Sequence, residues 1–332
     1  MSRKSKTKDL NAQFIVPALG NELLLVENKI AEETEHDNPL LSSMLKTILT
    51  QQGKMIRPTL TLLGGKTGNY NIDALVPLAA SVELLHTATL VHDDVIDSSD
   101  KRRGKPTPTV AFNNKNSILI GDFLFSTAAS FVAETNNIRV ISLFARTLRS
   151  IVSGELAQNA SAFEYDTDMD TYFDKIIGKT ASLFATAVEG GGIVSDCSDA
   201  ETLCLRRYGL NLGIAFQIID DILDFAGDDQ LGKPVGQDLF SGKLTLPALL
   251  FIKANPKNSF IRQAFNGTRR ESNLTKAIAA IQTSNVLRES QKIAKKFADA
   301  AVNNIEPMRS ELNPRTRHAF EVIANSVISR NK

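Results

Sequence analysis

The sequence has no tryptophan and very little cysteine or histidine. Two cysteines and four histidines occur among 332 residues. The cysteines, Cys197 and Cys204, do not form a CxxC pair, and no HExxH pattern is present. A disulfide framework or a zinc site of the common types needs more of these residues at defined spacings. The sequence therefore argues against zinc chemistry of these types and favours a reducing, cytoplasmic environment.

An excess of charge of either sign is also missing. The chain has 38 Lys+Arg against 37 Asp+Glu, whereas a nucleic-acid-binding protein normally has a basic excess. Its basic first residues are not followed by the apolar core of a secretory signal. No apolar run reaches the ~18–20 residues that cross a bilayer. We therefore expect a cytoplasmic protein that binds no nucleic acid and has at most peripheral contact with a membrane.

Strand-like alternation is nearly absent, and apolar residues recur at helical spacing instead. The predicted helical segments are 14–30, 40–49, 74–95, 117–133, 140–157, 172–188, 203–225, 274–281, 286–302 and 316–328. Several of them are apolar on more than one face, which indicates helices buried in a bundle. We predict one all-α domain over residues 13–332, preceded by a disordered tail of residues 1–12.

A short acidic motif, DDxxD, occurs twice near the end of an apolar helical segment. The aspartates are Asp93, Asp94 and Asp97 in the first motif and Asp220, Asp221 and Asp224 in the second. Residues four apart lie on one face of a helix, so the first and last aspartates of each motif point the same way. Like charges at this spacing destabilise a helix, and among apolar neighbours they need a counter-charge. Mg²⁺ can supply it, because carboxylates and substrate phosphates commonly bind this ion.

A solvated acidic helix end is the simpler interpretation of a single DDxxD, since short motifs also match by chance. The second copy favours a metal site, because both copies are embedded in Ile, Val and Leu. If the two helices face one another, the motifs form two walls of one site for Mg²⁺ and diphosphate. His86 and His92 lie on the first-motif helix, where a histidine is more often a packed core residue than a functional one.

Basic residues cluster near both motifs. The segment 101–105, KRRGK, directly follows the first motif, and arginine binds phosphate oxygens in pairs. Lys54 and Arg57 lie in GKMIRP, which lacks the GxxxxGK[ST] pattern of a nucleotide phosphate loop. The segment 227–242 follows the second motif and is rich in Gly, Pro and Lys. It can form a loop that closes over an anion, although each of these segments also fits an ordinary solvated loop.

Eight segments in a fixed order resemble the trans-polyprenyl diphosphate synthases, the polyprenyl synthetase family. The segments are GKMIRP, ELLHTATLVHDDVIDSSDKRRG, GDFLF, GEL-AQ, GKTASLF, FQIIDDILDF, GKPVGQDL and GKLTLP. Each alone is modest evidence, but all of them in order are highly specific. The resemblance covers nearly the whole chain and is strongest to bacterial medium- and long-chain synthases of the heptaprenyl and octaprenyl type.

This resemblance implies an isoprenoid-synthase-type helical bundle around a deep central cavity. It also implies head-to-tail (1'-4) condensation of isopentenyl diphosphate with an allylic prenyl diphosphate, assisted by a trinuclear Mg²⁺ cluster with bound diphosphate. The implied metal ligands are Asp93, Asp97 and Asp220. The other motif aspartates belong to the same catalytic set. Lys179, Thr180 and Gln217 match positions near the allylic ester oxygen and the developing cation.

The resemblance further divides the basic residues between the two substrates. Arg102 would bind the allylic diphosphate. The residues implied to bind isopentenyl diphosphate are Lys54, Arg57, His86 and Arg103. Lys233 and Lys243 would add positive charge over the bound diphosphate. Closure of the 227–242 loop would keep water from the cation.

Product length is expected to depend on the helix that carries the first motif. Ala88 and Thr89 lie about one turn before Asp93, and Leu84 and Leu85 lie about one turn deeper. In the family, a bulky aromatic residue at the upper positions blocks growth of the product. Ala88 is small and Thr89 is modest in size, so we expect a product longer than C20. The alternative interpretation is that Ala88 is simply a good helix former in a tight core.

Other functions share parts of this pattern. A class I terpene cyclase also ionises prenyl diphosphates, but it usually has an Asn/Ser/Glu-type second metal motif and lacks the site formed by Lys54, Arg57 and His86. A non-catalytic subunit of a two-component synthase is expected to have lost carboxylates, and none is missing here. An active subunit that needs a small partner stays open. We expect either a homodimer or a heterodimer with a small subunit.

Overall fold

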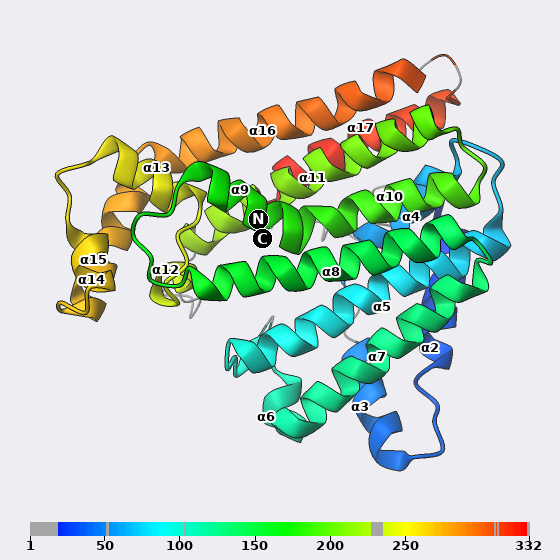
Figure 1. Cartoon of the computed structure of the whole chain (residues 1–332), viewed down its shortest axis with the longest axis horizontal. Helices are drawn as coiled ribbons and strands as arrows, with labels where there is room; N and C mark the ends of the chain where they lie inside the picture. Colours follow the sequence, from blue (N-terminus) through cyan, green and yellow to red (C-terminus); the bar gives the residue numbers. More distant parts are fainter. Residues whose placement is uncertain are drawn as a thin grey trace, which may run out of the picture. The chain divides into compact units, whose positions relative to one another are not determined.

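The computed structural model describes residues 19–50, 53–102, 104–226, 235–308, 310 and 312–330. Within these residues the only strands are one two-residue pair, and the regular structure is otherwise helical (Figure 1). The predicted all-α fold is therefore confirmed. The predicted tail, residues 1–12, and the predicted site residues Arg103 and Lys233 lie outside the described residues.

The chain divides into two compact units. Unit 1 consists of Met1–Phe144, Ala187–Leu205 and Ser310–Ile323, and unit 2 consists of Ala145–Thr186, Arg206–Arg309 and Ala324–Lys332. The helices with residues in both units are α8 (Ile138–Ala160), α10 (Ser182–Val194), α11 (Asp199–Phe225) and α17 (Pro314–Ile328). The single domain expected over residues 13–332 stays a prediction.

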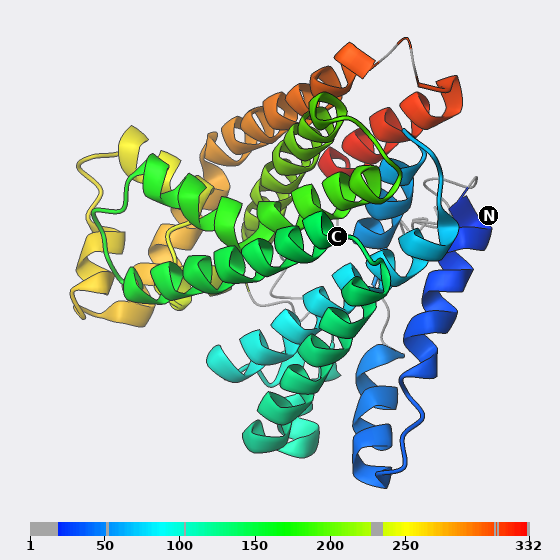
Figure 2. The ribbon, with the colours of Figure 1, turned by 45° about the vertical axis from the view of Figure 1, so that its right-hand side comes forward.

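In unit 1, the helix that carries the first motif packs against several others. The elements wholly within unit 1 are α2 (Gly20–Glu32), α3 (Pro39–Leu49), α4 (Ile56–Gly65), α5 (Ile72–Ile96), β1 (Lys101–Arg102), β2 (Lys105–Pro106), α6 (Pro108–Phe112) and α7 (Asn114–Glu134). α5 begins after Asn71, whose side chain accepts a hydrogen bond from the Ala74 N–H, as a helix N-cap does. It packs against α7, α4 and α2, and α5 and α7 lie side by side (Figure 2).

α5 and α7 are also long and apolar enough, by length and composition, to span a membrane. Glu83 interrupts the apolar residues of α5 and Asp122 interrupts those of α7, so neither helix is an uninterrupted apolar run of this length. The share of the most apolar window that is buried within the structure is 61% in α5 and 44% in α7. Core helices of soluble proteins have the same composition, because a helix that is buried on several sides is apolar on several sides.

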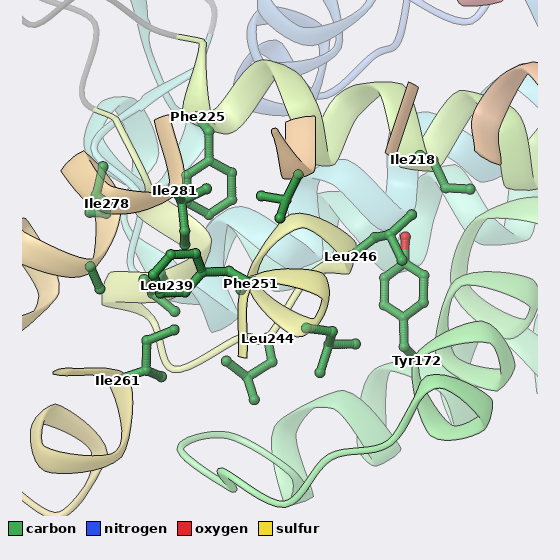
Figure 3. Close-up of a cluster of buried hydrophobic side chains, with 14 of the residues drawn as sticks. Tyr172, Ile218, Phe225, Leu239, Leu244, Leu246, Phe251, Ile261, Ile278 and Ile281 are labelled. Atoms are coloured by element: carbon green, nitrogen blue, oxygen red, sulfur yellow. The ribbon is translucent and has the colours of Figure 1, made fainter. Parts of the chain in front are cut away.

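Unit 2 has its own buried cluster of hydrophobic side chains. The elements wholly within unit 2 are α9 (Met169–Ile176), η2 (Ile177–Ala181), α12 (Gln237–Phe240), α13 (Leu246–Ala254), α14 (Phe260–Phe265), α15 (Arg270–Thr283), α16 (Val286–Ile305) and η4 (Glu306–Met308). Phe225, Leu239, Leu246 and Phe251 lie in the cluster (Figure 3). Phe225 ends α11, directly after the second motif, so this packing anchors the end of the helix that carries the motif.

The sequence predicted one helical segment over residues 172–188, whereas the structure divides it into three elements. α9 ends at Ile176, η2 is a π-helical turn, and α10 begins at Ser182. Apolar residues still recur at three- and four-residue spacing across this turn, which is why the pattern did not reveal it. Such turns are frequent at functional sites, and this one contains Lys179 and Thr180.

Candidate active site

The first motif lies at the C-terminal end of α5. Asp93 is half-buried and Asp97, the C-cap residue, is exposed. The Asp97 N–H donates a 2.8 Å hydrogen bond to the Asp93 carbonyl oxygen, so the last helical turn is intact. A helix C-terminus carries a partial negative charge. Carboxylates at this end are therefore unfavourable for the helix, which supports a role in binding a cation.

The middle aspartate of the first motif differs from its neighbours. Asp94 is only 2% exposed, and Arg102 Nε donates a 2.9 Å hydrogen bond to its Oδ1. Burial raises the pKa of the Asp94 carboxyl, and the Arg102 guanidinium opposes that shift. Arg102 lies on β1, which pairs with β2 in a short antiparallel hairpin whose Gly104 has a φ of 77°. The predicted diphosphate ligand Arg102 therefore also tethers the basic hairpin to α5.

His92 is held in place by packing against α7. Its Nε2 lies 3.1 Å from the Ile118 carbonyl oxygen, and its ring contacts Phe125 at a centroid distance of 5.3 Å. Gly121 lies so close that a Cβ at this position would collide with the imidazole. These contacts favour the interpretation of His92 as a packed residue, and they give the glycine of GDFLF a structural role.

Three of the residues expected to bind isopentenyl diphosphate, Lys54, Arg57 and His86, lie on or beside two packed helices of unit 1. Lys54 and Arg57 flank the start of α4, whose N-cap residue Met55 is in the left-handed region with a φ of 50°. Arg57 is 9% exposed, while Lys54 and His86 are half-buried. α4 packs against α5, which carries His86. Their shared role in binding a diphosphate stays a prediction.

The residues expected to control product length lie in the middle of α5. Leu84, Leu85 and Ala88 are fully buried. Thr89 is half-buried, and its hydroxyl donates a 2.7 Å hydrogen bond to the His86 carbonyl oxygen. All four therefore belong to the interior or its edge, and whether they line a product tunnel stays a prediction.

The second motif lies near the C-terminal end of α11 and repeats the burial pattern of the first. Asp220 is half-buried, whereas Asp221 is 1% exposed. The Tyr172 hydroxyl donates a 2.6 Å hydrogen bond to Asp221 Oδ2, and Gln217 Nε2 donates a 3.0 Å bond to Oδ1. Burial, reinforced by the Asp238 carboxylate, raises the pKa of Asp221 to about 7. In both motifs the middle aspartate is thus buried and accepts hydrogen bonds from protein side chains, and the first aspartate is more exposed to solvent.

The last aspartate of the second motif anchors the segment that follows α11. Asp224 Oδ1 accepts a 3.0 Å hydrogen bond from the Gln237 N–H, and Oδ2 accepts a 3.3 Å bond from the Asp238 N–H. Burial and the Asp238 carboxylate raise the pKa of Asp224 to about 7. The N–H of Lys243 donates a 2.8 Å hydrogen bond to the Asp238 carbonyl oxygen. Lys243 therefore follows a turn whose backbone is hydrogen-bonded to Asp224 of the second motif.

Lys179 and Thr180 are brought to the second motif by close backbone approaches. A Cβ on Gly154 would lie 2.8 Å from the Lys179 backbone nitrogen, and a Cβ on Gly213 would lie 2.5 Å from the Ala181 Cα. Only glycine permits these approaches of α8 and α11 to η2. Gly213 is one turn before Gln217, whose Oε1 accepts a 2.7 Å hydrogen bond from the Thr180 hydroxyl.

Four residues near the second motif were not among the predicted site residues. Glu155 forms an ion pair with Lys179, and Tyr172 bonds Asp221. Asp238 lies next to Asp224. Arg330 lies 3.1 Å from Asp220 Oδ1 through Nη2, and its guanidinium stacks on a phenylalanine ring. Glu155 lies in the GEL-AQ segment and Asp238 lies in the GKPVGQDL segment, so these segments could have identified both residues. Tyr172 and Arg330 lie outside every motif.

The open carboxylates fit a hard metal ion that is bound together with a phosphate group. In the part of the chain that the structure describes, no group of three or more His, Cys, Asp or Glu side chains is arranged to hold a metal. Aspartate oxygens are nevertheless the donors that Mg²⁺ prefers, and this ion commonly completes its coordination with substrate phosphates and water. The carboxylates of Asp93 and Asp97 in unit 1, and that of Asp220 in unit 2, each supply donors of this type.

Comparison with known proteins assigns the chain to a family. The polyprenyl synthetase family pattern matches residues 38–282. The chain is 35% identical to octaprenyl diphosphate synthase of Escherichia coli over 296 residues, which cover 88% of this chain and 92% of that protein. It is 32% identical to heptaprenyl diphosphate synthase component 2 of Geobacillus stearothermophilus over 289 residues, which cover 87% of this chain and 90% of that protein. The chain belongs to the polyprenyl synthetase family.

A solved structure supports the same assignment. The polyprenyl synthase of Caulobacter crescentus, complexed with calcium and isoprenyl diphosphate, superposes with a TM-score of 0.88 at 33% sequence identity. The match covers 99% of this chain and all of that one. The isoprenoid-synthase-type fold expected from the sequence is therefore confirmed.

Proposed function

We propose that this chain is a prenyltransferase that joins isopentenyl diphosphate to an allylic prenyl diphosphate by head-to-tail (1'-4) condensation. The product is a linear trans-polyprenyl diphosphate. Membership of the polyprenyl synthetase family supplies the reaction class. One observation carries the proposal for this chain. Both acidic motifs are complete, and in each the middle aspartate is buried against protein donors while the first is more open.

The metal of the proposed reaction is Mg²⁺, and several ions bind together with diphosphate. Asp93, Asp97 and Asp220 hold them through their carboxylate oxygens. When bound, Mg²⁺ neutralises the charge that collects on the departing diphosphate. The ion pairs of Lys179 with Glu155 and of Arg330 with Asp220 keep two cationic groups at the second motif.

The chain's own residues bind and orient the two substrates. Arg102 and Lys179 bind the allylic diphosphate, where negative charge develops as the carbon–oxygen bond breaks. Lys54, Arg57 and His86 fix isopentenyl diphosphate so that its double bond can attack the allylic carbon. Such orientation can supply several kcal/mol of the barrier. The departed diphosphate takes the proton that is finally lost, so no protein base is required.

The proposed product is longer than C20. The relatives include proteins named as octaprenyl, heptaprenyl and solanesyl diphosphate synthases. Ala88, fully buried on α5, is the small residue that would let a growing chain pass. A class I terpene cyclase is the weaker alternative, because the second motif keeps all three aspartates.

The proposed partner is a second copy of the chain. Ile118 and Leu119 are exposed on α7, and Val152 and Leu156 are exposed on α8, as at surfaces that pack against another chain. A small second subunit is the alternative, because one relative is named a synthase component. Light scattering of the purified active protein distinguishes these states from a monomer. We also propose that the protein is cytoplasmic, since both cysteines are free thiols.

Incorporation of labelled isopentenyl diphosphate tests the proposed function. Purified chain is incubated with Mg²⁺ and the labelled substrate, with or without geranyl, farnesyl or geranylgeranyl diphosphate. We expect labelled prenyl diphosphate only when an allylic substrate is present, and we expect EDTA to abolish its formation. Release of diphosphate from the allylic substrate alone, with no incorporation, would support the cyclase instead.

A further inference from the structure

The short helix α12 ends in a turn that is completed by a side chain from another helix of unit 2. Three of the last four carbonyls of α12 accept hydrogen bonds from the backbone N–H groups of residues 241–243. The fourth, the carbonyl oxygen of Phe240, accepts a 2.8 Å hydrogen bond from Nη2 of Arg270 on α15. The last carbonyls of a helix need partners of this kind, and an arginine side chain can supply one.

The guanidinium of Arg270 also stacks on a phenylalanine in an unusual backbone conformation. Its Cζ lies 4.2 Å from the ring centroid of Phe163, which belongs to the connection 161–168 between α8 and α9 and has a φ of 65°. The Phe163 N–H donates a 2.9 Å hydrogen bond to the Gly242 carbonyl oxygen, and its ring packs edge-to-face on Phe265. A residue other than glycine keeps such a φ only where surrounding contacts hold it.

Gly242 is the point at which the connection meets the turn. A Cβ on Gly242 would lie 2.6 Å from the Phe163 ring, and Gly242 has a φ of 79°, so only glycine fits here. Leu239 and Leu244, which lie before and after Gly242, are buried in the hydrophobic cluster of unit 2 (Figure 3). The turn 236–243 is therefore held by the cluster, by Phe163 and by Arg270.

The beginning of the same turn is hydrogen-bonded to the second motif. The Gly236 N–H donates a 2.9 Å bond to the Asp224 carbonyl oxygen, and the Asp224 carboxylate accepts from the N–H groups of Gln237 and Asp238. Lys243 ends the turn. Burial and the Asp238 carboxylate raise the pKa of Asp224, and the positive charge of Lys243 opposes that shift. The Lys243 ammonium therefore lies near the motif, at the end of the turn that Arg270 holds.

We propose that Arg270 is a positioning residue for the allylic diphosphate. It acts through the turn 236–243, because its contacts with Phe240 and Phe163 fix the end of the turn that carries Lys243. The place of the Lys243 ammonium at the second motif depends on this end. The inference rests on the proposed function, which gives Lys243 a diphosphate to bind. The residues expected to bind isopentenyl diphosphate belong to unit 1, so their substrate should be little affected.

The first test measures the turn without any substrate. Arg270→Ala removes both contacts, and Arg262→Ala is the matched control. Arg262 is also an exposed arginine, and its guanidinium stacks on Tyr165 of the same connection at 4.5 Å. We expect Arg270→Ala to raise the rate of amide hydrogen exchange in the peptide 235–243 by at least about threefold, because the end of the turn opens more often. Arg262→Ala should leave this rate within about 1.5-fold of the original.

The second test asks whether Arg270 acts through Lys243. We expect Arg270→Ala to lower kcat/KM for the allylic substrate by about fivefold and to leave the KM for isopentenyl diphosphate within about twofold. Lys243→Ala should lower the same ratio by about twentyfold or more, because the charge itself is lost. The double variant should be at most about twofold worse than Lys243→Ala alone, since the position of a missing ammonium no longer matters. Arg262→Ala should keep all these constants within about twofold.

Two results would overturn the positioning role. One is unchanged exchange of the turn in Arg270→Ala, and the other is a double variant whose loss equals the product of the two single losses. If Arg270→Ala fails to fold, Phe163→Leu carries both tests, because it removes the stacking partner and keeps an apolar side chain. A wild-type chain that condenses no substrate would contradict the proposed function instead, and the exchange measurement would still show whether Arg270 holds the turn.

Discussion

Arg102 Nε lies 2.9 Å from Asp94 Oδ1, and this ion pair joins the basic hairpin to the helix that carries the first motif. Asp94 is buried, and Arg102 lies on β1, the first strand of the hairpin. The second motif has an equivalent middle residue, Asp221, which is buried and held by Tyr172 and Gln217. We infer that in each DDxxD the middle aspartate supports the local structure, while the first, which is more exposed to solvent, binds the metal.

Removal of an open aspartate should abolish most of the activity without unfolding the protein. We expect Asp93→Ala or Asp220→Ala to lower kcat by roughly a hundredfold or more, since each removes a carboxylate proposed to bind metal. Steady-state rates with excess Mg²⁺ measure the loss, and circular dichroism checks the fold. Asp122→Ala, an exposed aspartate on α7, is the control and should keep its activity. Near-normal rates in both motif variants would rule out the metal assignment.

The two anionic substrates should respond to different basic residues. Lys54→Ala and Arg57→Ala should mainly raise the KM for isopentenyl diphosphate, whereas Arg102→Ala and Lys179→Ala should mainly impair use of the allylic substrate. The reason is that a charge lost from one diphosphate pocket leaves the other intact. KM and kcat are measured for each substrate in each variant. Equal losses toward both substrates in all four variants would count against separate pockets.

The close approach of α8 to the π turn gives a prediction about a glycine. A Cβ on Gly154 would lie 2.8 Å from the Lys179 backbone nitrogen, whereas a Cβ on Gly20 would meet nothing within 4 Å. Gly154→Ala should therefore destabilise the protein by about 1–3 kcal/mol and lower kcat, because it displaces Lys179. Gly20→Ala should be nearly neutral. Thermal melting and kinetics measure both, and a neutral Gly154→Ala would show that this packing is loose.

Product length should respond to the size of the residue at position 88. Ala88 is fully buried on α5 and lies about one turn before Asp93. Ala88→Phe should shorten the product while activity is kept, because the larger side chain would block the path of the growing chain. Chromatography of the dephosphorylated products measures their length. An active variant with an unchanged product would show that Ala88 only packs the core.

Much of the fold could be predicted from the sequence, because apolar periodicity depends on local spacing. The helices that carry both motifs were predicted within a few residues of their observed ends. The π turn was not predicted, because apolar residues still recur at three- and four-residue spacing across it. The contact of Arg330 with Asp220 was also missed, because it joins residues far apart in the sequence. The burial of Asp94 and Asp221 likewise depends on tertiary partners, whereas the motif itself suggests three equivalent carboxylates.

Mass spectrometry of the reaction product is the most direct measurement of the central claim. The purified chain is supplied with Mg²⁺, farnesyl diphosphate and deuterated isopentenyl diphosphate. The account predicts a series of linear prenyl diphosphates that differ by one deuterated five-carbon unit each and extend beyond C20. A cyclic hydrocarbon without deuterium, or unchanged farnesyl diphosphate beside intact isopentenyl diphosphate, would contradict it.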